Sequence, residues 1–246
     1  MPDPLLSVTN LFVSFGDRTV IEDLSFTVQA GEGLAVIGPN GAGKTVLLKA
    51  LLGLIPHSGT IRWSQDARLG YVPQKIEADR QLPLRLRDLL TAKTAVLKLP
   101  RTEVAQVTSY LGLTQEILDT SIGHLSGGQF QKALIAFALL GRPNVLLFDE
   151  PTASLDELAE ERVYEMLHSL QQDKGMTVIL VSHDLSVVYR YADMVLCISK
   201  GAPCMGPPRE VLTPEMLETL YGTPPKYYRH AHGADVPPRN LRSSPE

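Results

Sequence analysis

Gly38-Pro39-Asn40-Gly41-Ala42-Gly43-Lys44-Thr45 matches the pattern G-x-x-x-x-G-K-[ST] at every fixed position and lies between two apolar runs. The run before it, residues 34–37, predicts a buried parallel strand, and residues 46–52 predict a helix that ends at Gly53. A strand, a glycine-rich loop and a helix in this order are typical of a phosphate-binding loop. A plain glycine turn is the alternative, and the Lys-Thr pair in register argues against it.

The loop's chemistry follows from its residue types. Glycines expose backbone N–H groups that converge on one anion, and the helix that follows adds free N–H groups and the positive end of its dipole. In this arrangement Lys44 is expected to reach the β- and γ-phosphates of a bound polyphosphate, and the Thr45 hydroxyl is expected to bind Mg²⁺.

The composition indicates one large α/β domain, alone or with a subdomain. The chain has 246 residues, of which 44% are hydrophobic, and this is enough for a sizeable core. The formal net charge of −4 gives no general attraction for nucleic acid, so no nucleic-acid partner is expected.

The N-terminus and the apolar segments predict a cytoplasmic protein. Met1-Pro2-Asp3-Pro4 lacks the basic stretch and apolar run of a secretory signal. The longest candidate span, residues 133–141, is broken by Arg142-Pro143 and is too short to cross a bilayer, so any membrane role is expected to be peripheral.

Two cysteines, Cys197 and Cys204, flank a turn expected at Lys200-Gly201. Their spacing matches no common zinc or redox signature, and in the cytoplasm reduced thiols are expected. A disulfide or a metal-binding pair is the less favoured alternative.

Strand-like segments surround the loop on both sides in the sequence. An antiparallel β region is expected ahead of it, and short strands follow the first helix, with Gln74 at the end of the second. These segments are residues 6–9, 11–15, 24–28, 59–63 and 69–74.

The middle of the chain changes character. From residue 75 to about 122 apolar residues recur at helical spacing on both sides of Pro100, which predicts a helical subdomain inserted into the α/β core. The core then resumes with strands, one helix and finally, from about Thr223, a loosely ordered tail. The expected strands are residues 145–148, 177–181 and 194–198, and the helix is 157–172.

One further segment narrows the interpretation to a superfamily. Leu125-Ser126-Gly127-Gly128-Gln129 resembles the signature motif of ABC ATPases. The other family motifs follow in family order: Gln74 in the Q-loop position, Asp149-Glu150 after the Walker B strand, Ala153–Asp156 as the D-loop, and His183 as the switch histidine. The resemblance implies an ABC ATPase domain over residues 1–222, with the helical subdomain at about 75–125 and a tail at 223–246.

The resemblance also implies that the ATP site is shared between two chains. In the family the signature motif closes over nucleotide bound to the partner's loop, so Ser126, Gly127, Gly128 and Gln129 are expected to contact ATP in a homodimer. From the residues alone, a serine and two glycines at a helix start make a second anion-binding nest. A flexible turn is the alternative.

The resemblance to ABC ATPases implies a role in hydrolysis for each matching residue. Asp149 is expected to hold Mg²⁺, and Glu150 to act as the general base on the attacking water. His183 matches the γ-phosphate sensor, and Gln74 is implied to touch Mg²⁺ and the attacking water. Without the resemblance, the alternatives are that Asp149 and Glu150 are a solvated strand end, that His183 is a structural histidine and that Gln74 is a polar strand end.

Two positions concern the nucleotide itself. Phe15 falls where the family usually has a tyrosine that stacks on adenine, and a phenyl ring can stack as well, although Phe15 could instead belong to the core. Val46 stands where a second hydroxyl commonly reaches the α-phosphate, so only its backbone N–H is expected to contribute there.

The absence of a predicted span implies a separate integral membrane permease, contacted through the helical subdomain near Gln74. Several stretches resemble the ATPase subunits of zinc and manganese importers, which implies metal import, a peripheral place on the cytoplasmic face of the inner membrane, and an extracytoplasmic substrate-binding protein as an indirect partner. They are Tyr71–Lys75, Leu82–Leu84, Arg87–Leu89, Val181–Val188 and Asp193–Cys197. Import of iron complexes or another small solute remains open, as does a soluble ABC ATPase that assembles or remodels a complex.

The tail contains Tyr228-Arg229-His230-Ala231-His232, which resembles the histidine-bearing ends of some metal-importer subunits. His230 and His232, with Asp235, are a candidate metal sensor. A solvated tail is the alternative and is the commoner case.

Overall fold

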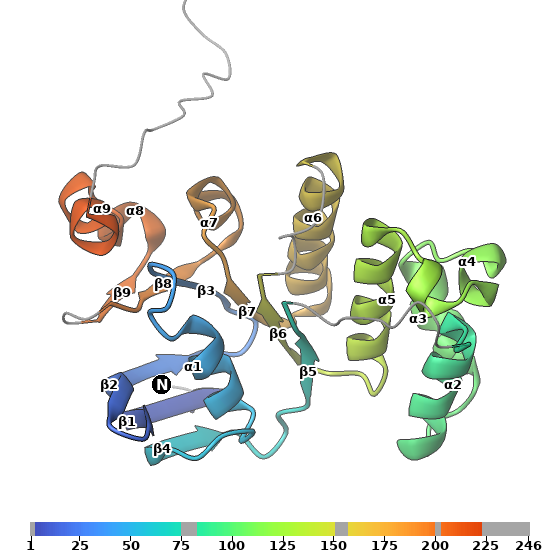
Figure 1. Ribbon diagram of the computed structural model, residues 1–246, viewed down its shortest axis with the longest axis horizontal. Helices are drawn as coiled ribbons and strands as arrows, with labels where there is room; N and C mark the ends of the chain where they lie inside the picture. The colour runs from blue at the N-terminus through green and yellow to red at the C-terminus, as the bar shows by residue number, and fades with distance from the viewer. Residues whose placement is uncertain (1–2, 75–82, 151–156, 200–202, 223–246) are drawn as a thin grey trace, which may run out of the picture.

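Two β-sheets with helix α1 between them form the body of the protein in the computed structural model, which describes residues 3–74, 83–150, 157–199 and 203–222 (Figure 1). The strands are β1 (Leu6–Phe15), β2 (Arg18–Val28), β3 (Gly33–Ile37), β4 (Ser58–Trp63), β5 (Leu69–Val72), β6 (Val145–Asp149), β7 (Thr177–Val181), β8 (Met194–Cys197) and β9 (Cys204–Gly206). The helices are α1 (Lys44–Leu51), α2 (Leu86–Val96), α3 (Thr102–Tyr110), α4 (Gln115–Asp119), the 3₁₀ turn η1 (Ile122–His124), α5 (Gly127–Leu139), α6 (Glu157–Lys174), α7 (Leu185–Tyr191), α8 (Pro208–Val211) and α9 (Pro214–Tyr221).

The smaller sheet is antiparallel, in the order β2-β1-β4. β1 and β2 form a hairpin in which Leu6 pairs with Val28 and Phe15 pairs with Arg18. β1 is a single strand with bulges where two shorter strands were predicted, since β-bulges absorb the break in the apolar alternation. The predicted N-terminal antiparallel region is confirmed.

The larger sheet has the order β5-β6-β7-β3-β8-β9, with every neighbouring pair parallel except β8 and β9. Successive residues of a strand face opposite sides of the sheet. In β6, Leu147 faces the cluster that contains α1, whereas Leu146 and Phe148 face the cluster formed by α6 and the helices after β5. Burial on both faces explains why these strands are uniformly apolar in sequence.

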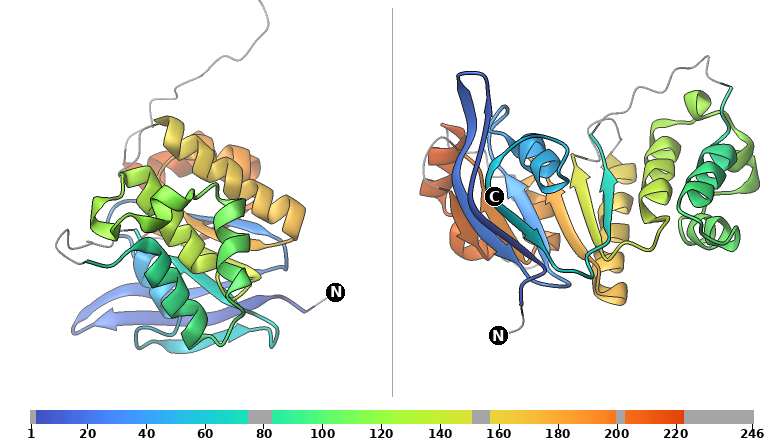
Figure 2. Two further views of the ribbon diagram at one scale, coloured as in Figure 1. Left: turned by 90° about the vertical axis from the view of Figure 1, so that its right-hand side faces the viewer. Right: turned by 90° about the horizontal axis from the view of Figure 1, so that it is seen from below.

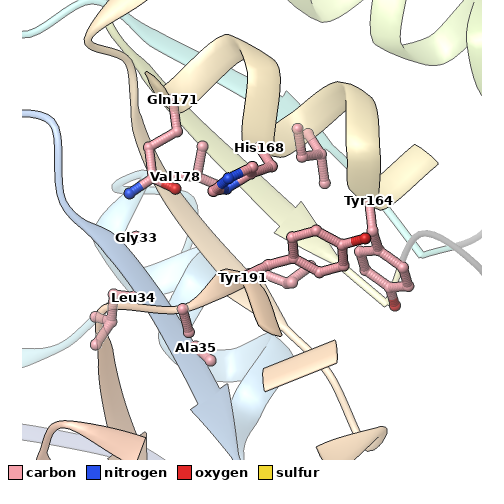
Figure 3. A pocket seen from close by; sticks show the side chains of 11 residues that line it. Gly33, Leu34, Ala35, Tyr164, His168, Gln171, Val178 and Tyr191 are labelled. Carbon is pink, nitrogen blue, oxygen red and sulfur yellow. The ribbon is translucent and has the colours of Figure 1, made fainter. Parts of the chain in front are cut away.

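The layers are arranged around this sheet (Figure 2). α1 packs between the two sheets through Leu47, Leu48 and Leu51, and α6 covers the other face. Under α6 lies a small cavity of about 20 Å³, beside His168 and Tyr191 (Figure 3). That volume holds about one water, and the His168 Nδ1 atom has no hydrogen-bond partner among the described residues.

Helices α2 to α5 form a separate group beside β5, at one side of the molecule (Figures 1 and 2). They lie between β5 and β6 in the chain, as predicted for the helical insertion. Their core is built from Leu86 and Leu90 of α2, Leu111 and Leu113 after α3, and Leu118 of α4. Residues 75–82, the predicted start of the insertion, lie outside the described residues.

The C-terminal part contains elements that the sequence did not predict. β9, α8 and α9 pack beside β8, where Leu217 and Leu220 join Ala35 and Ile37 in a third apolar cluster. β9 and α8 were missed because they have three and four residues, too few to show a period. The predicted tail from Thr223, with His230 and His232, lies outside the described residues.

The prediction of reduced thiols is wrong in this structure, in which Cys197 and Cys204 form a disulfide. The two residues pair directly across the antiparallel strands β8 and β9, with their Cα atoms 5.0 Å apart. Directly opposed side chains on antiparallel strands lie close enough for the sulfurs to bond. The sequence spacing alone did not reveal this register.

Candidate functional site

The glycine-rich loop connects β3 to α1, and its first glycine is required by a close approach. Gly38 has φ 150°, and a Cβ atom there would lie 2.1 Å from the carbonyl oxygen of Ile198. Gly43 has φ 105° and precedes α1 without a side-chain cap. The first N–H groups of α1 therefore have no capping side chain and remain available to an anion, as the pattern predicted.

Lys44 is the first residue of α1 and is almost entirely buried, with 6% of its surface exposed. Its Nζ atom donates to the carbonyl oxygens of Gly38 at 2.9 Å and Pro39 at 3.2 Å. The ammonium is therefore held against the loop itself, where it can meet a phosphate.

Thr45 and Asp149 meet at the carboxyl end of β6. The Thr45 hydroxyl donates to Asp149 Oδ1 at 2.9 Å, and Asp149 is 1% exposed. Burial raises the pKa of Asp149 above its ordinary value, and the hydrogen bond from Thr45 opposes that rise. A hydroxyl and a buried carboxylate side by side are the oxygen donors that Mg²⁺ takes in phosphate sites.

Tyr71 is a member of this group that the sequence interpretation did not place in the site. Its hydroxyl lies 3.5 Å from Asp149 Oδ2, and burial together with the Asp149 charge raises the pKa of Tyr71 to about 12. Tyr71 reaches Asp149 because β5 runs parallel to β6. Only this pairing reveals the contact, since the two residues are far apart in sequence.

Glu150 follows β6 and occupies a left-handed backbone conformation with φ 45°. Its Oε2 accepts a hydrogen bond from Gln74 Nε2 at 2.6 Å, and its Oε1 lies 3.8 Å from Lys44 Nζ. A non-glycine residue in this region costs energy and is often found at functional sites. The structure thus brings together Gln74, Lys44 and Glu150, and Gln74 lies two residues beyond the end of β5.

Among the described residues no hydrogen bond or ring contact joins His183 or Phe15 to the loop. His183 is exposed, two residues after the end of β7, whose Val181 pairs with Asp149. Phe15 ends β1 and is 52% exposed, so the alternative that it belongs to the core is wrong. An exposed ring remains available to stack on a base.

The predicted signature segment starts helix α5. Ser126 is the N-cap, its hydroxyl accepts from the backbone N–H of Gln129, and the Gln129 side chain accepts from the Ser126 backbone N–H. This capping box explains the Ser-x-x-Gln spacing. Ser126 and Gly127 are exposed, and within the described ranges no hydrogen bond or ion pair joins this segment to the glycine-rich loop. The predicted D-loop, Ala153–Asp156, lies outside the described residues.

A parallel sheet, a glycine-rich loop before α1 and paired acids at the end of a neighbouring strand define an α/β nucleotide-binding protein of the phosphate-loop class. Residues 21–153 match the family model described as ABC transporter. The chain belongs to this family and is an ABC transporter ATPase.

Relatives cover nearly all of the chain. It is 37% identical over 235 residues to a zinc import ATP-binding protein, ZnuC, of Ruegeria pomeroyi, covering 94% of this chain and 90% of the relative. The ZnuC of Chromohalobacter salexigens is 35% identical, with 93% and 95% covered.

Two solved structures support the family placement. A chain of an ABC transporter described as metal-chelate type, in an inward-facing conformation, gives a TM-score of 0.81 at 31% identity, with 90% of each chain covered. CbiO1 of Clostridium perfringens, described as part of the transporter complex cbiONQ, gives 0.72 at 26% identity, with 90% and 97% covered.

Proposed function

We propose that this ATPase drives the import of a divalent metal cation, zinc or manganese, through a membrane permease. The observation that supports ATP hydrolysis is a cluster of four side chains at one edge of the sheet: Lys44, Thr45, Asp149 and Glu150. Import of a metal cation is supported by the zinc import proteins, which are 35 to 37% identical to this chain over at least nine-tenths of both chains.

In this proposal the chain's own residues divide the work of hydrolysis. Lys44 and the loop N–H groups bind the β- and γ-phosphates, and Thr45 and Asp149 would hold Mg²⁺, with Gln74 as a further contact. Mg²⁺, when bound, neutralises phosphate charge. Glu150 accepts a proton from the attacking water. The Gln74 side chain, whose Nε2 lies 2.6 Å from Glu150 Oε2, orients the Glu150 carboxylate.

The remaining contacts to ATP come from two chains. We assign Phe15 to the adenine and His183 to the γ-phosphate, both from the chain that supplies the loop. Ser126–Gln129 of a second copy would complete the site, because that segment is exposed and has no described bond to its own loop. ATP binding then closes a homodimer around two nucleotides.

The proposal also includes a membrane partner. Among the described residues no helix is long and apolar enough to span a membrane. We propose that a separate integral permease contacts the helices α2–α5 near Gln74, and that the protein lies peripherally on the cytoplasmic face of the inner membrane. A substrate-binding protein outside the membrane would deliver the cation. The ATPase domain in this proposal spans 1–222, with 75–125 as the inserted part.

A second substrate is favoured by one observation. The solved transporter with a TM-score of 0.81 is described as metal-chelate type, so import of a metal complex such as an iron chelate is the alternative to import of the bare cation.

Uptake in cells tests the substrate and the base together. Cells lacking this chain are complemented with wild type or with Glu150→Gln, and ATP-dependent uptake of radiolabelled Zn²⁺, Mn²⁺ and an iron chelate is measured. Loss of Zn²⁺ or Mn²⁺ uptake, restored only by wild type, is the expected result. Restoration by Glu150→Gln would overturn the base assignment, and a defect confined to the chelate would replace the substrate.

A further inference from the structure

A second cleft, of about 380 Å³, lies at the other end of the parallel sheet from the glycine-rich loop. Its lining includes Arg68, Asn144 and Met176, which come directly before β5, β6 and β7. The ATP-binding residues follow the opposite, carboxyl ends of the strands. The cleft is therefore separate from the site described above, and its volume is within the usual range of about 300–1,000 Å³ for small-molecule sites.

The charges in this cleft are unequal. It is lined by three cations, Arg68, Arg142 and Lys174, and by one acid, Glu103. Glu103 is 3% exposed and accepts two hydrogen bonds of 2.9 Å from Arg142 Nε and Nη2, so that its charge is already compensated. Burial raises the pKa of Tyr110, and a second acid, Asp173, is close enough to that residue for its charge to raise the pKa further. Three cations against two carboxylates leave an excess of one positive charge.

Arg68 and Lys174 retain donors for a ligand. The Arg68 Nε atom donates to the Arg142 carbonyl oxygen at 2.8 Å, and among the described residues no ion pair uses either Arg68 or Lys174. Guanidinium groups bind carboxylates and phosphates with two parallel hydrogen bonds. This part of the cleft is therefore suited to an anionic group.

Most of the remaining lining is apolar or aromatic, with Gln106 and Asn144 as its polar members. Lys174 Nζ lies 3.8 Å from the centre of the Tyr110 ring, and Val107, Leu139 and Leu170 line the same space. Apolar walls around a few converging polar groups are typical of sites for organic ligands. A bare inorganic ion would leave these walls without a partner.

The backbone conformation at Arg142 indicates that contacts around the cleft hold this residue in place. Its φ is 51°, a left-handed backbone conformation that residues other than glycine rarely adopt. That conformation accompanies both the hydrogen bond from Arg68 and the paired bonds to Glu103. A strained backbone conformation of this kind persists where surrounding contacts require it.

We propose that this cleft, the Arg68 cleft, binds a small organic anion whose carboxylate or phosphate meets Arg68 and Lys174 and whose apolar part lies against Tyr110 and Val107. Arg68 precedes β5 and Lys174 ends α6, whereas Val107 and Tyr110 belong to α3. A bound anion therefore bridges the sheet and the helical group that carries Ser126, and it stabilises their relative placement.

Binding of anilinonaphthalene sulfonate, a fluorescent organic anion, tests the proposal in the full chain. Saturating Mg·ADP occupies the nucleotide site during the titration. Wild type is expected to bind one probe per chain, and the double variant Arg68→Gln, Lys174→Gln is expected to bind at least tenfold more weakly. Arg62→Gln, which removes an exposed charge from β4, is the matched control and should bind as wild type does.

Competition distinguishes an anion site from an apolar surface. Benzoate should displace the probe, and the neutral analogue benzyl alcohol at the same concentration should not. Thermal unfolding of each variant establishes that it is folded. The proposal is overturned if the double variant binds the probe with wild-type affinity, if Arg62→Gln weakens binding equally, or if benzyl alcohol competes as well as benzoate.

Discussion

The glycine-rich loop and the Ser126 segment are both helix starts that offer backbone N–H groups to an anion, but their surroundings differ. At the loop, buried Lys44 and Asp149 are engaged by residues of the same chain. At Ser126, the capping box closes the segment on itself and the surface is exposed. Only the loop gathers buried charged side chains of its own chain, whereas the Ser126 segment is exposed and capped by its own residues. The proposed homodimer would bring the Ser126 segment of one chain to the loop of the other.

The largest expected effect separates chemistry from binding at the loop. Glu150→Gln keeps the shape and the hydrogen bond to Gln74 but removes the base, so phosphate release should fall about 10²–10⁴-fold while ATP binding persists. The measurements are steady-state phosphate release and equilibrium ATP binding. A variant with turnover close to wild type would exclude Glu150 as the base.

The second prediction addresses the Ser126 segment directly. Gly127→Asp places a negative charge at the start of α5, which should repel the γ-phosphate in trans and reduce hydrolysis about 10²-fold, in the range for loss of one transition-state donor. ATP binding to the single chain should remain as in wild type. Thr102→Asp adds the same charge to the first turn of α3 and is the control. Weakened ATP binding by the isolated Gly127→Asp chain would mean that the segment acts in cis.

Lys44→Ala should weaken ATP binding at the loop about 10- to 100-fold, because a hydrogen bond to a charged group contributes about 1.5–3 kcal/mol. The Ser126 segment should keep its structure. Isothermal titration with ATP gives the affinity, and Lys49→Ala, in the last turn of the same helix, controls for loss of a charge. Equal losses in the two variants would point to general electrostatics instead of a contact by Lys44.

Ser126→Ala tests the stability of the second region. Loss of the N-cap hydrogen bond should lower the free energy of unfolding by about 1 kcal/mol, while ATP binding to the single chain stays unchanged. Urea unfolding monitored by circular dichroism measures the first quantity. Unchanged stability would show that the capping box contributes nothing measurable to α5.

The smallest effect is a pH dependence at the loop. Because burial raises the pKa of Asp149 in the folded protein, the stability that this group contributes is fully present below its ordinary pKa and is lost as pH rises through the raised value. Asp149→Asn should therefore raise the melting temperature of the nucleotide-free protein at about pH 7.5, and this gain should shrink towards about pH 5. A gain that grows on acidification would reverse the sign of the proposed shift.

Local patterns in the sequence were sufficient for much of the loop region. The apolar strand before Gly38, the helix after Lys44 and the helix start at Ser126 are all set by neighbours within a few residues. The structure confirms each of these elements. Short elements without a period, such as β9, could not be found in this way.

By itself the sequence determined the class of fold, the glycine-rich loop and the identity of the acids after β6, because periodicity and residue chemistry are local properties. Only the tertiary structure decided that Tyr71 lies against Asp149, that Gln74 holds Glu150, that Cys197 faces Cys204 and that Arg68 shares a cleft with Lys174. Each of these contacts depends on strand order and register or on how helices pack against the sheet. Long-range pairing of this kind arises from burial of the whole core, which no short segment encodes.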